Sequence, residues 1–287
     1  MLDRVAGPWS SIAMALLLWL AGLGTAHAWS GDAHQLVANL AYERLTPAAR
    51  SEVDRLIATQ SANAGRCRIE SFARASTWPD CVLRRASGYG HTRPHHYINI
   101  PITGSTTVQD GCREVGCIRE AIARYERTLA NRGASDRERL QALAFLTHLI
   151  ADLHQPLHVS NNCDRGGNAI DVILPTGATP DLHEAWDDHL ARNAMRGRGR
   201  RAIAALVIQN GGRWSGGTVE AWALEGNEIA RRFAYGTLPV RLRCGEAPQT
   251  PLMISNAYVQ QSEPIIRQQL ARASVRLAMR LNALLAG

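Results

Sequence analysis

One mostly apolar stretch, residues 144–159, is dense in side chains that can bind a metal. It contains His148, Asp152, His154 and His158. Positions four apart share a helix face, so His148 and Asp152 should point the same way. The apolar neighbours predict a buried helix, in which a carboxylate is costly unless it is paired or bound to metal. This pattern suits a divalent metal such as zinc, although a buried Asp–His hydrogen bond is the simpler alternative.

The helix should end near Pro156. Proline lacks the backbone donor that a helix interior needs, and it restricts the preceding Gln155 to extended geometry. His158 can then turn back toward the point that His148 and Asp152 face. A third ligand after a turn would complete a metal site.

Residues 181–187 repeat the four-residue spacing with His183 and Asp187. The run is not the His-Glu-x-x-His motif of zinc proteases, because Asp187 stands where the second His is needed. Glu184 lies on a different helix face and should be exposed. The simpler alternative for His183 and Asp187 is an ion pair on the helix surface.

A third group of polar residues lies between positions 80 and 96. His95 and His96 are adjacent, so in extended chain only one of them should face a site. Asp80 follows Pro79 in a segment expected to be a loop that Cys81 holds in place. Taken singly, each of these residues is more often structural than functional.

The first 28 residues have the pattern of a secretory signal peptide. Arg4 precedes the apolar run 12–23, and a small-x-small sequence ends at Ala28. The run is short for a membrane span, so an uncleaved anchor is the weaker alternative. Cleavage after Ala28 would make Trp29 the N-terminus and place His34 shortly after a free α-amino group, which can bind a metal once it loses its proton.

All six cysteines follow Ala28, and export together with an even number favours disulfides. No Cys-x-x-Cys pair supports the alternative of a cysteine zinc site. Several complete pairings remain open. Short loops favour Cys67–Cys81 and Cys112–Cys117, which leaves Cys163–Cys244.

The net charge is +7, and every basic side chain is an arginine because the chain contains no lysine. The planar guanidinium group matches phosphate well, so this composition suits phosphate-bearing partners. Coding bias toward arginine would give the same composition, so the charge alone does not identify the partner.

Helical periodicity dominates the chain, and no long alternation predicts a strand. The fold class is therefore all-α, in one domain over residues 29–287 with long irregular segments. A short hairpin is expected around residues 169–174. The expected helices cover residues 32–46, 47–58, 118–129, 137–155, 181–194, 200–209, 218–235 and 256–284.

Several motifs follow one another in a recognisable order. They are Trp29 with His34, Trp78-Pro79-Asp80, His96-Tyr97-Ile98-Asn99, the run from Phe145 to His158, Gly166-Gly167-Asn168, the run from Leu182 to Asp187, and the run from Arg276 to Asn282. With these motifs the chain resembles the S-one/P-one zinc nucleases, or type I nucleases, from Trp29 to about Gly287. The resemblance implies the mainly helical fold of the phospholipase C/P-one nuclease type.

The resemblance also implies three zinc ions. The first would be held by Asp80, His96, His148 and Asp152. The second would be held by His158, His183 and Asp187. The third would be held by the Trp29 amine and carbonyl with His34 and Asp152, so that Asp152 bridges two metals. His154 matches a family histidine that is not a ligand, and we expect it to orient a ligand through a hydrogen bond.

The activity that this resemblance implies is endonucleolytic hydrolysis of single-stranded DNA and RNA to 5′-phosphate products, with 3′-nucleotidase activity. Asp80 and Asp152 would serve catalysis together with a zinc-bound water. The expected enzyme is a monomer that acts on nucleic acid and nucleotides. It would be secreted or periplasmic, without membrane contact once the signal peptide is removed.

Substrate contacts follow from the same resemblance. Tyr97 stands where the family stacks an aromatic ring on a base, and Asn168 matches an asparagine near the substrate. Asn99 replaces an Asp that reads a base edge in fungal members. Fungal members also use a lysine near the phosphate, which this chain lacks, and Arg113 is one candidate to replace it.

Two rival functions remain open on the sequence alone. A bacterial zinc phospholipase C shares the fold and begins its mature chain with Trp, but the run from Asp152 to His158 and the Gly166-Gly167-Asn168 loop look more like the nucleases. The other rival is an exported protein that binds metal without catalysis.

Overall fold

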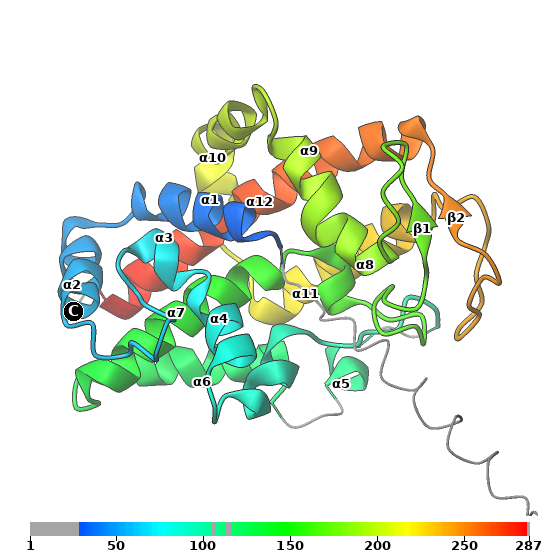
Figure 1. Ribbon diagram of the computed structural model, residues 1–287. Helices are drawn as coiled ribbons and strands as arrows, with labels where there is room; N and C mark the ends of the chain where they lie inside the picture. The colour runs from blue at the N-terminus through cyan, green and yellow to red at the C-terminus, as the bar shows by residue number, and fades with distance from the viewer. Residues whose placement is uncertain (1–28, 105–106, 113–115, 286–287) are drawn as a thin grey trace, which may run out of the picture.

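The computed structural model describes residues 29–104, 107–112 and 116–285, so the predicted signal peptide and Arg113 lie outside the described residues. The fold is mainly helical, which confirms the predicted fold class (Figure 1). The α-helices are α1 (Gly31–Tyr42), α2 (Pro47–Ala58), α3 (Phe72–Ala75), α4 (Trp78–Arg85), α5 (Val108–Gly111), α6 (Ile118–Ala130), α7 (Asp136–Asp152), α8 (Leu182–Glu184), α9 (Ala191–Met195), α10 (Gly199–Trp214), α11 (Val219–Ile229) and α12 (Asn256–Leu285).

Shorter elements connect these helices. The 3-10 helices are η1 (Gly90–His96) and η2 (Pro156–Val159), and the π-helical turns are η3 (Ala185–Leu190) and η4 (Ala230–Ala234). Strand β1 (Val172–Ile173) pairs in parallel with β2 (Leu252–Met253). The hairpin expected near residues 169–174 is formed by backbone hydrogen bonds from Val172 to residue 180 and from Leu174 to residue 178. The same segment also pairs with β2, which was not expected. The partner strand β2 had no signal in the sequence.

Helix α7 runs through the middle of the molecule (Figure 1). It packs against α6, α1, α3, α4 and α12, and every side chain from Ala142 to Asp152 is buried. A helix that is apolar on all faces belongs in a core, which explains why His148 and Asp152 lie so deep. The helix ends at Asp152, before the expected boundary at Gln155. Gln155 is extended (ψ 117°), as the following Pro156 requires, and Pro156 opens η2.

Asp80 lies in a helix, so the expectation that it lies in a loop was wrong. Helix α4 begins at Trp78, and Pro79 occupies its first turn, where the missing backbone N–H costs nothing. The loop expectation overlooked that proline is well suited to the first turn of a helix. This places Asp80 in the first turn of α4, on an element that packs against α7.

The six cysteines form three disulfides. The pairs are those expected from the sequence, with Cα–Cα distances of 5.7 Å for Cys67–Cys81, 5.5 Å for Cys112–Cys117 and 5.0 Å for Cys163–Cys244. The last pair ties the loop that follows η2 to the segment before β2, so two irregular regions hold each other in place. In the described part of the chain, no helix has an apolar stretch long enough to cross a membrane.

A capping box starts α7 and gives a stability test. The Ser135 hydroxyl accepts the backbone N–H of Glu138, and the Glu138 carboxylate accepts the backbone N–H of Ser135. Ser135→Ala should lower the free energy of unfolding by about 1 kcal/mol, measured by urea denaturation. Thr128→Ala, which removes a hydroxyl bonded only within α6, is the control. An equal loss in both variants would contradict this role for Ser135.

Candidate metal centre

Three groups of potential metal ligands converge at the end of α7. Within each group the ligand atoms lie within 4.8 Å of one another. The groups are His34, His148 and Asp152; Asp80, His96 and His148; and His158, His183 and Asp187. A further group of Cys112, Cys117 and Glu120 meets the same distance criterion, but its sulfurs are joined in a disulfide and cannot serve as thiolates.

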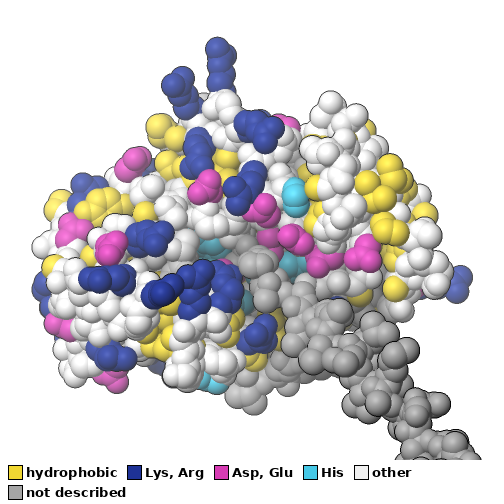
Figure 2. Space-filling view, viewed as in Figure 1, with side chains coloured by type: hydrophobic (Ala, Val, Ile, Leu, Met, Phe, Trp, Pro, Cys, Tyr) yellow, Lys and Arg dark blue, Asp and Glu magenta, His cyan; other side chains and the backbone are white. Residues whose placement is uncertain are grey.

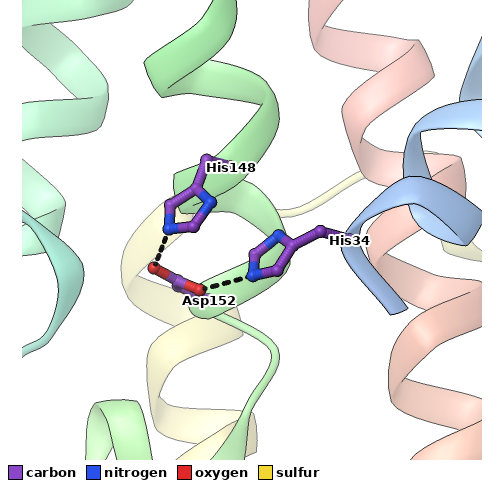
Figure 3. A group of neighbouring side chains, drawn as sticks. All are labelled: His34, His148 and Asp152. Atoms are coloured by element: carbon purple, nitrogen blue, oxygen red, sulfur yellow. Dashed lines mark ion pairs between the residues drawn. The ribbon is translucent and has the colours of Figure 1, made fainter. Parts of the chain in front are cut away.

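His148 belongs to the first two groups, and the Asp152 carboxylate lies close to members of both. Its Oδ1 lies 3.2 Å from His34 Nε2, and its Oδ2 lies 3.0 Å from His148 Nε2 (Figure 3). His34 reaches the carboxylate from α1, and its ring stacks on that of His148 with centroids 4.1 Å apart. The predicted sharing of one face by His148 and Asp152 is confirmed.

The second group adds η1 and α4 to the same carboxylate. His96 Nδ1 lies 3.1 Å from Asp152 Oδ2 and 3.0 Å from His148 Nε2. Asp80 Oδ1 lies 3.6 Å from His148 Nε2 and 3.9 Å from His96 Nδ1. Four side chains from three elements therefore face one point.

The third group includes His158 of η2, whose Nδ1 lies 3.9 Å from Asp152 Oδ2. His158 Nε2 and His183 Nε2 lie 3.5 Å and 3.2 Å from the two oxygens of Asp187. Gln155 donates from Nε2 to Asp187 Oδ1 at 2.7 Å. His183 and Asp187 are both buried, so the alternative of a surface ion pair is wrong. The expected helix over residues 181–194 is interrupted by the π-helical turn η3, which contains Asp187; such turns are frequent at functional sites.

Hydrogen bonds to backbone carbonyls fix three of the histidine rings. The Nδ1 atoms of His148, His158 and His183 donate to the carbonyls of Ser76 (2.7 Å), His96 (2.8 Å) and Gly166 (2.7 Å). A proton held on Nδ1 leaves the lone pair of Nε2 directed into the cluster. This arrangement is common for histidines that bind metal.

The clusters leave buried polar atoms without hydrogen bonds. They are His34 Nδ1 and Nε2, His96 Nε2, Asp152 Oδ1, His158 Nε2, His183 Nε2 and Asp187 Oδ2. Buried polar atoms normally have partners, because a missing hydrogen bond leaves their desolvation uncompensated. Nitrogen and carboxylate oxygen are donors that zinc prefers. The residues present therefore fit metal ions at these positions.

The electrostatics of the clusters keep the carboxylates ionised. Burial raises the pKa of Asp152, but the charges of His148 and His158 outweigh burial and hold this pKa well below its usual range. Burial lowers the pKa of His158, but Asp187 and Asp152 outweigh it and raise the pKa to about 9. A metal that binds His158 below that pH must therefore displace a proton.

Trp29, the expected mature N-terminus, lies against this centre. Its indole Nε1 donates to the Ala151 carbonyl at 3.0 Å, and its side chain is buried. The next residue, Ser30, donates its backbone N–H to the Asp187 carbonyl at 2.7 Å. The chain segment at Trp29 is thus held between the end of α7 and η3, close to His34.

His154 does not orient a ligand, so that expectation was wrong. Its Nδ1 donates to the Ile150 carbonyl at 2.7 Å, and its Nε2 accepts from Arg276 of α12 at 2.9 Å. Arg276 also pairs with Glu225 of α11. Gln155, through its bond to Asp187, has the supporting role instead.

Only one of the two adjacent histidines faces the site, as expected, although they lie in a 3-10 helix and not in extended chain. His96 faces the cluster, and His95 bonds to Tyr125.

A cavity of about 310 Å³ opens beside the clusters. Its wall includes the three expected substrate contacts, Tyr97, Asn99 and Asn168, all of them half-buried. Asn168 also donates to the Arg165 carbonyl at 2.7 Å. The wall includes two residues that sequence reasoning missed, Arg93 and Arg165. The only available signal was their position beside motifs already singled out, three residues before His96 and one before Gly166-Gly167.

Comparison with known proteins gives one consistent family. A family model described as S1/P1 Nuclease matches residues 29–286. Endonuclease 2 of Arabidopsis thaliana is 27% identical over 94% of this chain and 96% of its own. Nuclease S1 of Aspergillus oryzae is 27% identical over 89% and 91%. Among solved structures, the Alpha Toxin from Clostridium absonum matches with a TM-score of 0.42 and 13% identity, over 90% of this chain and 67% of that chain.

The contact between Gln155 and Asp187 predicts a loss of metal affinity. Gln155→Ala should weaken zinc binding at the His158, His183 and Asp187 group about 10- to 100-fold, because Asp187 loses the group that orients it. Zinc retained during titration with a competing chelator measures this. Gln141→Ala, which removes the same amide from a bond to Tyr89 elsewhere on α7, is the control. Equal zinc retention in both variants would rule the role out.

Proposed function

Because the chain belongs to the S1/P1 nuclease family, and is thus a phosphodiesterase that acts on nucleic acid, we propose that it is an exported endonuclease with three zinc ions. It would hydrolyse single-stranded DNA and RNA to 5′-phosphate products and act as a 3′-nucleotidase. The observation that carries the proposal is the convergence of three ligand groups on the end of α7, beside a cavity of about 310 Å³.

The proposed ligand sets are built on the three groups, with Asp152 added to the second group and Trp29 in place of His148 in the first. Asp80, His96, His148 and Asp152 would hold one zinc. His158, His183 and Asp187 would hold the second. The amine and carbonyl of Trp29, with His34 and Asp152, would hold the third. What supports this assignment is that the side chains of the proposed ligands lie close together and that each set includes at least one buried donor atom without a hydrogen-bond partner.

Bound zinc would supply a Lewis acid for the phosphodiester and lower the pKa of a water molecule toward neutrality. The protein's own contribution is charge and position. Asp152 and Asp80 place fixed negative charge where the two histidine groups meet, and the carbonyls bound to Nδ1 atoms hold the rings in one orientation. No side chain is then required to act as the general base.

Residues of the cavity wall would position the substrate. Tyr97 follows the proposed ligand His96 directly and offers a ring on which a base can stack, a contact worth about 1–3 kcal/mol per base. Asn99 and Asn168 offer amide groups to a base or sugar. Stacking does not distinguish bases strongly, which suits a nuclease that acts on many sequences.

The proposed setting is outside the cytoplasm. Three disulfides require an oxidising compartment, and the first 28 residues have the pattern of a signal peptide. We also propose that the enzyme acts as a monomer, because each ligand group is supplied by one chain. Family membership argues against both a phospholipase C and a metal-binding protein without catalysis.

Asp152 provides the sharpest test of the proposal. Asp152→Asn should abolish release of acid-soluble nucleotides from single-stranded DNA, because it removes a charge shared by two ligand groups. Asp54→Asn, which changes an exposed carboxylate on α2, should leave the rate unchanged. Release of choline phosphate from lecithin is assayed in parallel. Activity of the wild-type protein on lecithin alone, or bound zinc without any turnover, would refute the nuclease proposal.

A second test concerns the position of Trp29. Protein with one extra residue before Trp29 should lose the zinc held by the terminal amine and most of its activity, as measured by zinc content and rate. His34→Ala should remove the same zinc, so combining both changes should cause no further zinc loss. Unchanged zinc content in the extended protein would show that the amine is not a ligand.

A further inference from the structure

Two arginines line the cavity beside the metal clusters. Arg93 lies in η1 and Arg165 in the loop that follows η2, and both side chains are exposed. We propose that these two guanidinium groups bind the substrate phosphates that flank the bond to be cleaved. This inference rests on the proposed nuclease function and assigns the phosphate contacts of that same site.

The backbone holds Arg165 at a defined place relative to the clusters. Asn161 Oδ1 accepts the backbone N–H groups of Asp164 and Arg165 at 3.1 Å and of Gly166 at 3.4 Å. Arg165 has a φ of +60°, a conformation that is costly for a residue other than glycine and that recurs at binding sites. His183 then bonds to the Gly166 carbonyl, so a proposed zinc ligand and Arg165 share one tightly bonded loop.

Arg93 is placed by the same element that carries His96. Side chains three residues apart in a 3-10 helix lie above one another, so Arg93 and His96 project from the same side of η1. Both residues line the cavity. Arg165 therefore lies on the loop that carries Asn168, and Arg93 lies on η1, which ends just before Tyr97.

Within the described ranges, no carboxylate neutralises either cavity arginine, whereas several arginines elsewhere in the fold are paired. Arg84 pairs with Asp80, Arg192 with Asp188 and Arg139 with Glu52. Among the described residues, neither Arg93 nor Arg165 has an acidic side chain within ion-pair distance. On the face shown in Figure 2, arginines are interspersed with acidic residues and do not form a single basic patch. Attraction of a polyanion to the cavity then depends on unneutralised charge in its wall.

The chemistry of the groups matches the proposed ligand. A guanidinium fork can donate two parallel hydrogen bonds to one phosphate, and this geometry holds the phosphate in register. Contacts of this kind are independent of base sequence and position the strand. The chain has no lysine, so arginine is the side chain available for this role.

The experiment compares Arg93→Ala, Arg165→Ala and the corresponding lysine variants of the zinc-loaded protein. The control is Arg201→Ala, an exposed arginine on α10. Each of the two alanine variants should raise KM for a short single-stranded oligonucleotide about 5- to 10-fold with little change in kcat. The slope of log affinity against log salt should fall by about 0.7 for each phosphate that the variant no longer binds. The lysine variants should retain that slope.

A substrate without flanking phosphates separates this inference from the proposed function. Hydrolysis of bis-para-nitrophenyl phosphate should be unchanged in both alanine variants. Equal losses on that substrate, or a KM and salt slope equal to those of Arg201→Ala, would overturn the assignment. If the wild-type protein cleaved neither substrate, the nuclease proposal would fail; anisotropy of a phosphorothioate oligonucleotide would still show whether the two arginines bind phosphate.

Discussion

The fold depends on a charge buried at the end of a central helix. Asp152 is fully buried and ionised, and a carboxylate in that position is strongly unfavourable without compensation. Its two oxygens lie near His34 of α1, His148 of α7 and His96 of η1. Three parts of the chain that are distant in sequence must therefore meet at one carboxylate. This requirement explains why α1 packs against α7 and why η1 lies over its C-terminal end.

The second carboxylate, Asp187, is stabilised by a different arrangement. It sits in a π-helical turn, accepts a hydrogen bond from Gln155 and faces His158 and His183. Its backbone carbonyl accepts the N–H of Ser30, next to Trp29. The two carboxylates are linked through the short segment from Leu153 to His158, and Pro156 gives that segment its turn. The loop carrying Arg165 is bonded to His183, so the cavity wall and the metal clusters form one connected structure.

Local periodicity predicted part of this arrangement from the sequence. The spacing of His148 and Asp152 was sufficient because positions four apart share a helix face wherever the helix lies. The contacts of His34 and His96 with that helix, and of His183 with His158, are tertiary, and family resemblance was needed to anticipate them. The role of His154 could not be inferred, because its partner Arg276 is 122 residues away. Asp80 was expected in a loop held by Cys81, whereas Pro79 lies in the first turn of α4, a position that proline favours.

The most direct test of three metal-binding groups is anomalous X-ray diffraction at the zinc absorption edge, on crystals of the protein that begins at Trp29. We expect three zinc peaks, one in each ligand group, with Asp152 shared between two of them and the amine of Trp29 bound to one. A single peak, or zinc bound away from Asp152 and Asp187, would contradict it.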